Sequence, residues 1–170
     1  MHHGHPHPSV RLAGSQDARC IAQLLHDFNN EFDEPTPTVV LLTRTIAKLL
    51  ERDDFVAFLA GVEPCGLAIL WLRPAIWTPG CDATLAELYV RPECRRRGLG
   101  AALVATALAV AADRGASLME VPVEESDSAA RRLYERFGFS RMRGGTEGDL
   151  MYHYERSLAG SDALTTSDGA

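Results

Sequence analysis

The sequence lacks a long hydrophobic run. No stretch of about 18 or more apolar residues occurs in the chain, so we expect no transmembrane helix. Residues 1–8, MHHGHPHP, lack the apolar core of a secretory signal peptide, which favours a cytoplasmic protein. The histidines of this stretch are typical of metal-binding tracts. The prolines between them favour disorder, and we expect no metal site.

Cysteine pairs with the spacing of a metal site or a redox motif are also absent. Cys20, Cys65, Cys81 and Cys94 stand far apart, which predicts free thiols. An excess of positive charge is missing too, because 17 basic and 23 acidic residues give a net charge of −6. This balance disfavours a nucleic-acid partner and suits a cationic small molecule.

Strand patterns and helix patterns do occur, in a regular order. They predict the order β-α-α-β-β-β-α-β-α-β-β, a mixed α/β (α+β) fold with helices on the faces of a central sheet. We expect one domain over residues 9–158 and a disordered tail over 159–170. The expected strands are 10–14, 55–62, 66–72, 83–90, 117–123, one near 139, and 149–157, and the second and third of these form an antiparallel hairpin. The expected helices are 15–28, 38–52, a run ending at Gly115, and 127–137.

Residues 95–100, RRRGLG, stand between the strand at 83–90 and a helix. The first N–H groups of a helix lack internal partners and bind anions, and glycine lets a phosphate approach the backbone closely. The segment is therefore a candidate diphosphate site. A Walker loop would need a lysine after the second glycine, and a dinucleotide fingerprint would need a third glycine where Leu103 stands. The pattern that fits is [Q/R]-x-x-G-x-[G/A].

Two stretches carry a resemblance to a known family. ELYVRPECRRRGLGAALV, at 87–104, and ESDSAARRLYERFGF, at 125–139, resemble the two signature motifs of the GNAT family of N-acetyltransferases, in order and at the family's spacing. The resemblance covers about residues 9–157 and implies the GNAT fold. It also implies acetyl-coenzyme A as co-substrate, with no metal.

The resemblance further implies where the cofactor binds. Asp127 stands where the family usually has asparagine; aspartate caps a helix equally well, but its carboxylate is less favourable beside coenzyme A phosphates. The implied cofactor-binding residues are Leu88, Tyr89, Val90, Arg95, Arg96, Arg97, Gly98, Leu99, Gly100, Ala101, Asp127 and Tyr134.

Three residues are candidates for catalysis. The resemblance places the general acid at Tyr134, whose phenol can protonate a thiolate leaving group. It also implies that the Val90 N–H polarises the thioester carbonyl. Strand alternation puts Leu85, Glu87 and Tyr89 on one face of the strand and Ala86, Leu88 and Val90 on the other. Glu87 is then either a base that deprotonates or binds the amine, or one half of a structural ion pair.

The acid-rich run NNEFDEPTP, at 29–37, is a candidate acceptor site. Glu31, Asp33 and Glu34 would suit a polyamine, an aminoglycoside or a basic peptide, and a solvated acidic loop is the alternative.

The sequence therefore predicts an N-acetyltransferase that moves an acetyl group from acetyl-coenzyme A to a primary amine of a small cationic molecule by direct attack. A protein lysine or N-terminal acetyltransferase and a non-catalytic acyl-coenzyme A sensor remain as alternatives. We expect no nucleic-acid or membrane partner, and a homodimer is left open.

Overall fold

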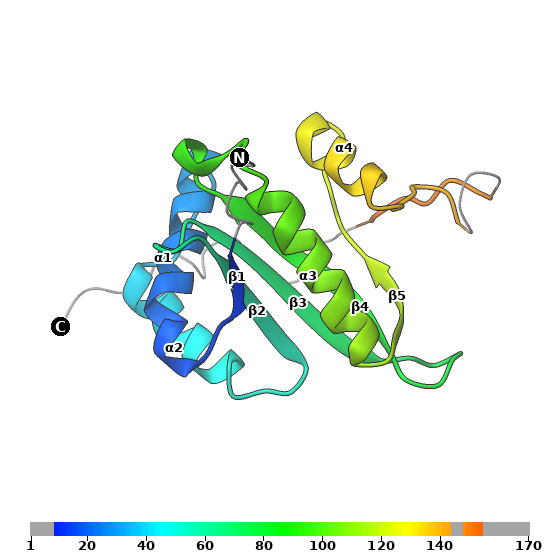
Figure 1. Ribbon diagram of the computed structural model, residues 1–170, viewed down its shortest axis with the longest axis horizontal. Coiled ribbons are helices and arrows are strands. Elements are labelled where there is room, and N and C mark those ends of the chain that lie inside the picture. Colours follow the sequence, from blue (N-terminus) through cyan, green and yellow to red (C-terminus); the bar gives the residue numbers. More distant parts are fainter. Residues whose placement is uncertain (1–8, 144–147, 155–170) are drawn as a thin grey trace, which may run out of the picture.

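The structure, a computed structural model, describes residues 9–143 and 148–154 and has a twisted five-stranded sheet at its centre (Figure 1). The strands follow chain order across the sheet, and all neighbours are antiparallel except the last pair, β4 and β5, which is parallel. The expected hairpin of β2 with β3 is confirmed. The strands are β1 (Val10–Leu12), β2 (Phe55–Ala60), β3 (Gly66–Pro74), β4 (Cys81–Val90) and β5 (Ala116–Glu120).

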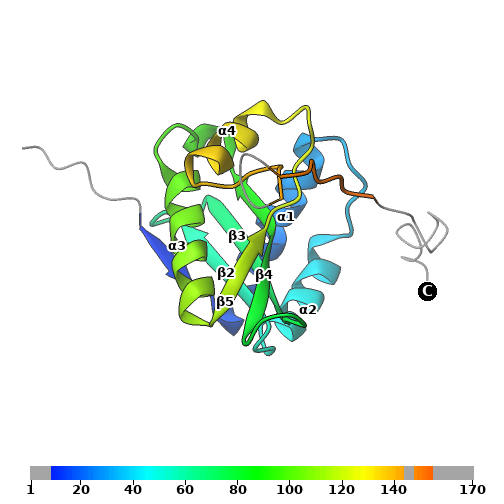
Figure 2. The same cartoon turned by 90° about the vertical axis from the view of Figure 1, so that its right-hand side faces the viewer.

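Helices cover both faces of this sheet. In Figure 2, α3 (Leu99–Asp113) lies on one side of the sheet, and α1 (Ala18–Glu31) and α2 (Val39–Leu49) lie on the other. The fourth helix, α4 (Ser128–Arg136), lies near the start of α3. Two apolar clusters result, one between the sheet and α3 with α4, and one between the sheet and α1 with α2. The predicted mixed α/β architecture is confirmed.

An ion pair between Asp17 and Arg11, which the sequence pattern did not reveal, lies at the start of α1. Asp17 ends a short 3-10 turn (Ser15–Asp17) and is the N-cap residue of α1, but its side chain caps nothing in α1. Its carboxylate instead accepts two hydrogen bonds from Arg11, at 2.7 and 2.8 Å, and one from the Gly14 N–H at 2.9 Å. The pair ties β1 to α1.

The chain after α4 differs from the expectation of two strands. Within the described residues, 137–143 and 148–154 form a single isolated bridge between Met142 and Leu150. Met151, Tyr152 and Tyr154 are exposed, so the part from 148 to 154 does not bury these side chains against the sheet. The tail at 159–170, the stretch at 1–8 and the end of the last expected strand lie outside the described residues.

One expectation for β4 is wrong. Leu85 lies opposite Leu70 and Glu87 lies opposite Ile69, so Ala86 is an extra residue that forms a β-bulge. Leu85 packs in the cluster on the α3 face, whereas Ala86 and Tyr89 pack on the α1 face. The simple alternation that placed Leu85 on the face of Glu87 and Tyr89 therefore breaks at Ala86.

Candidate active site

The two parallel strands part at the middle of the sheet. β4 pairs with β5 only from Cys81 to Thr84, and the rest of β4, residues 85–90, has no described neighbour on that side. The two strands therefore separate after Thr84, before the stretch Leu88–Val90 where the resemblance implies cofactor contacts. Beyond Thr84 the chain thus offers unpaired backbone groups along an open strand edge.

The backbone of Val90 faces this open edge. The Arg91 N–H donates to the Cys65 carbonyl at 2.9 Å, on the β3 side. Because the N–H and C=O of one trans peptide point in opposite directions, the Val90 carbonyl points away from β3. The N–H of an extended residue lies on the same side as its carbonyl, so the Val90 N–H faces the open edge as well.

Glu87 is half-buried on the same stretch of β4. Residues directly opposite each other on antiparallel strands share a face, so Glu87 lies on the α1 face with Ile69. Its carboxylate makes no hydrogen bond or ion pair with any residue in 9–143 or 148–154. The alternative role of Glu87, as one half of a structural ion pair, therefore has no partner among these residues. Burial raises the pKa of Glu87 above its ordinary 4.5, as a proton acceptor for an amine requires.

Tyr134 reaches the site from α4. Its side chain is buried in the α3-face cluster, with its ring centre 5.7 Å from that of Phe139, and Leu133 and Phe137 pack against the same cluster. Burial, followed by the negative charges of Asp127 and Glu87, raises its pKa to about 12. Tyr134 and Glu87 thus approach the open edge from opposite faces of the sheet. Asp127 caps α4 as expected, because its Oδ1 accepts from the Ala130 N–H at 2.9 Å.

The RRRGLG loop presents a run of free donors. None of the backbone N–H groups from Arg96 to Ala101 donates a hydrogen bond to another described residue. Two residues of the loop have left-handed backbone, Arg96 at φ 61° and Gly98, the N-cap of α3, at φ 79°. A non-glycine residue in this region is strained, and such strain is commonly found at ligand-binding sites. This loop therefore forms an anion cradle at the start of α3.

The three arginines of the loop differ. Arg96 and Arg97 are exposed, and their side chains make no hydrogen bond or ion pair within the described part of the chain. Arg95 is engaged: its Nε donates to the Val90 carbonyl at 2.8 Å, and its Nη2 donates to both carboxylate oxygens of Glu31 at 2.6 and 2.7 Å. Leu99 points into the core and Gly100 faces Leu133.

The structure separates the three acids of the candidate acceptor site. Glu31 is the last residue of α1 and pairs with Arg95. Asp33 and Glu34 are exposed in the turn that follows, and Asp33 has a left-handed backbone at φ 55°. Neither of these two side chains bonds to another described residue, so both carboxylates are open to a cation.

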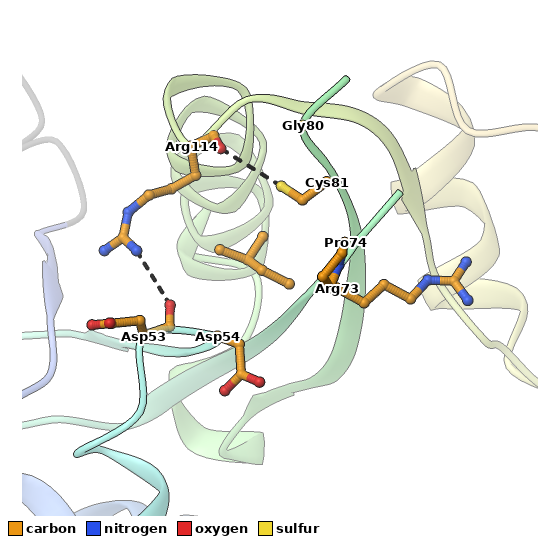
Figure 3. Close-up of a pocket in the computed structure, with 8 residues that line it drawn as sticks. Asp53, Asp54, Arg73, Pro74, Gly80, Cys81 and Arg114 are labelled. Atoms are coloured by element: carbon orange, nitrogen blue, oxygen red, sulfur yellow. Dashed lines mark hydrogen bonds between the residues drawn. The ribbon is translucent and has the colours of Figure 1, made fainter. Parts of the chain in front are cut away.

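A hollow in the surface lies far from these residues. It has a volume of about 350 Å³ and is lined by charged side chains and by Cys81, whose thiol donates to the Arg114 carbonyl (Figure 3). Cys81 begins β4, so the hollow lies roughly 30 Å from the RRRGLG loop at the other end of that strand. It brings together none of the predicted site residues.

The described residues contain no group of three or more His, Cys, Asp or Glu side chains able to hold a metal ion, and the four cysteines are free thiols. The histidines at 1–8 lie outside the described part. No helix in residues 9–143 and 148–154 combines the length and apolar character that crossing a bilayer needs.

Comparison with known proteins agrees with this geometry. Residues 21–139 match the acetyltransferase (GNAT) family. The chain belongs to this family. A solved structure from Arthrobacter sp. FB24, described as an acetyltransferase, is 43% identical over 92% of this chain and 99% of that one, with a TM-score of 0.78. A soil-metagenome aminoglycoside acetyltransferase has a TM-score of 0.73 at 18% identity over 89% of this chain and 97% of the other, which supports the fold alone.

The curated relatives act on different acceptors. A mycothiol acetyltransferase of Salinispora arenicola is 40% identical over 97 residues, 52% of this chain. A thialysine N-epsilon-acetyltransferase of Caenorhabditis elegans is 28% identical over 121 residues, 69% of this chain and 74% of the relative. The chain matches only 30% of the length of the Salinispora relative and 25% of a second mycothiol acetyltransferase, from Thermobispora bispora.

Sequence reasoning missed two features of this site. The first is the bulge at Ala86, which sets the face of Glu87. The second is a pair of ion pairs from α1 to the end of β4, Asp27 with Arg91 and Glu31 with Arg95. The spacing of four residues on both partners was a signal for the second feature, but it is visible only once the two segments are known to be neighbours.

Proposed function

We propose that the protein is an acetyl-coenzyme A-dependent N-acetyltransferase that acetylates a primary amine of a small cationic molecule by direct attack. The observation that carries the proposal is the run of unpaired N–H groups in the RRRGLG loop, which continues directly from the open edge of β4. The loop suits a diphosphate and the strand edge suits an amide-containing arm. Coenzyme A has both parts, joined in that order.

The reaction proceeds at the open edge of β4. Glu87 takes a proton from the ammonium group of the acceptor, directly or through a water, and the freed amine nitrogen attacks the thioester carbonyl carbon. The Val90 N–H stabilises the negative charge that develops on the carbonyl oxygen. The carbon–sulfur bond then breaks, and the thiolate takes a proton from Tyr134. No covalent acyl-enzyme is needed.

The two proton transfers assist each other. A phenol with a pKa near 12 is a weak donor to a thiolate, whose own pKa is about 8.5. Burial is the main cause of that high pKa, followed by the negative charges of Asp127 and Glu87. When Glu87 accepts the proton of the acceptor, the charge of Glu87 disappears and Tyr134 becomes a stronger acid. Deprotonation of the amine therefore prepares the site for departure of the thiolate.

The acceptor enters beside Asp33 and Glu34. Both carboxylates are unpaired within the described residues and exposed, and they follow the end of α1, which packs on the same face of the sheet as Glu87. Two such charges attract a cation and disfavour an acidic acceptor. The relative named for thialysine makes an amine of this kind the first to try.

A turnover screen with thiol detection tests the proposal. Acetyl-coenzyme A is offered with polyamines, aminoglycosides, thialysine, amino acids and basic peptides, and release of free coenzyme A is followed. We expect acceptor-dependent release with a small polyamine or amino sugar. Release only with peptides would show a protein acetyltransferase. Binding of coenzyme A without turnover over the panel would favour the sensor module.

A further inference from the structure

The guanidinium group of Arg95 bridges two elements that are far apart in sequence. Its Nε bonds to the Val90 carbonyl at the end of β4, and its Nη2 bonds to both oxygens of Glu31 at the end of α1. Its carbon lies 6.0 Å from the centre of the Tyr89 ring. Arg95 thus fills, at the open edge, the hydrogen-bonding place that a neighbouring strand would otherwise take at Val90.

The Glu31 carboxylate is held through both of its oxygens by Arg95 Nη2. Burial first, and then the Glu31 charge, raises the pKa of Tyr89 to about 12. The Tyr89 ring in turn packs against Phe28 of α1, with ring centres 5.2 Å apart. The charge of Glu31 is therefore already balanced, and an acceptor ammonium group would have to compete with a bidentate arginine.

A matched pair lies one helical turn earlier. Asp27 of α1 accepts from Arg91 Nε at 2.9 Å and from its Nη2 at 2.7 Å. The Asp27–Arg91 side chains are 27% and 31% exposed, against 25% and 42% for Glu31–Arg95. Arg91 makes no side-chain bond to Val90 among the described contacts. Both pairs tie α1 to the end of β4, but only the Glu31–Arg95 pair reaches the open edge and the loop.

We propose that Glu31 is a positioning residue: it holds Arg95 against the Val90 carbonyl and so fixes the end of β4 and the first residue of the RRRGLG loop before acetyl-coenzyme A binds. The inference rests on the proposed function and assigns Glu31 to the cofactor side of the site instead of the acceptor side. A loop ordered in advance loses less entropy on binding, so Glu31 strengthens coenzyme A affinity without touching the ligand.

Calorimetric titration of coenzyme A into Glu31→Gln and Asp27→Asn compares the two pairs without any need for turnover. We expect Glu31→Gln to raise the Kd of coenzyme A roughly 10-fold, the size of one lost charge-assisted hydrogen bond, and Asp27→Asn to change it less than about 2-fold. The acceptor KM at saturating acetyl-coenzyme A should stay within about 2-fold in Glu31→Gln, because the residue does not contact the acceptor.

A double-mutant cycle shows whether Glu31 acts through Arg95. In an Arg95→Ala background, Glu31→Gln should have no further effect on the Kd of coenzyme A. Equal losses in Glu31→Gln and Asp27→Asn, or a raised acceptor KM with unchanged coenzyme A affinity, would overturn the inference and leave the proposed function intact. Failure of the parent chain to bind coenzyme A would overturn the proposed function, and the inference with it.

Discussion

The hydroxyl group of Tyr134 can be removed with little effect on packing. Tyr134 is 7% exposed, and its ring lies among apolar side chains that a phenylalanine would contact equally well. Its hydroxyl donates no hydrogen bond to a described residue, so Tyr134→Phe deletes no described bond. Because no described bond is lost, we expect the free energy of unfolding to change by less than about 1 kcal/mol. For a chain of this size that is a shift in Tm of about 2–4 °C at most.

The effect on turnover should be much larger. A positioned general acid contributes roughly 10²–10⁴-fold, and a thiolate leaves more easily without a proton than an alkoxide does. We therefore expect kcat to fall about 10- to 1,000-fold, which is about 1.4–4 kcal/mol of lost transition-state stabilisation. Because the pKa of Tyr134 is about 12, the phenol stays protonated below pH 10. The ratio of parent to variant rates should accordingly be constant from about pH 6 to 9.

Steady-state kinetics with thiol detection, thermal unfolding and coenzyme A titration together test this reasoning. Tyr152→Phe removes the same hydroxyl from a ring that is 70% exposed and serves as the matched control, with unchanged kcat expected. Unchanged turnover and pH profile in Tyr134→Phe would remove Tyr134 from the mechanism. A large fall in Tm would instead show that the hydroxyl has a structural partner.

Three further substitutions test other parts of the site and fold. Glu87→Gln should lower kcat/KM about 10- to 100-fold at pH 7 and abolish the fall of kcat/KM at acidic pH. Because burial raises the folded-state pKa of Glu87, the variant should also unfold at a higher temperature at neutral pH, a gain that vanishes below the unfolded-state pKa of about 4.3. Gly100→Ala places a Cβ 3.5 Å from Leu133 Cδ2, which is an ordinary contact, so the Tm should not change. The added Cβ stands in the anion cradle, so calorimetry should show coenzyme A binding weakened by about 10-fold or more. Asp17→Asn should cost about 2 kcal/mol in urea unfolding at pH 7. Arg11 lowers the folded-state pKa of Asp17, so this cost is complete above about pH 4 and shrinks as the pH falls through the lowered value.

Local signals explain what the sequence could predict. The apolar spacing of α1, the Asp127 cap of α4 and the glycines at 98 and 115 act within one or two turns of backbone, so each is visible in a short window. The diphosphate loop is of the same kind, since a helix start with free N–H groups needs only its own residues.

Features that depend on segments far apart could not be predicted. Asp27 and Glu31 look like solvated charges until the end of β4, 64 residues later, is placed beside them. The bulge at Ala86 is likewise hidden, because the run from Leu85 to Val90 alternates acceptably in either register. Which register β4 adopts depends on the face that buries Leu85. Leu85 packs in the cluster with α3, a helix whose position a short sequence window does not show.

The bulge and the open edge together explain how the two proposed proton-transfer groups can meet. Tyr134 belongs to the core on the α3 face, and Glu87 lies on the α1 face. A continuous sheet would keep them apart. Because β5 leaves β4 after Thr84, no strand of the described residues lies between them, and each can reach the same edge from its own side. Without the bulge, Glu87 would share the face of Leu85 and enter the apolar core beside Tyr134, where an ionised carboxylate is strongly disfavoured. One extra residue in β4 therefore keeps the base on the α1 side, where the acidic turn after α1 can attract a cationic acceptor, and leaves the acid on the side where α3 and its diphosphate loop begin.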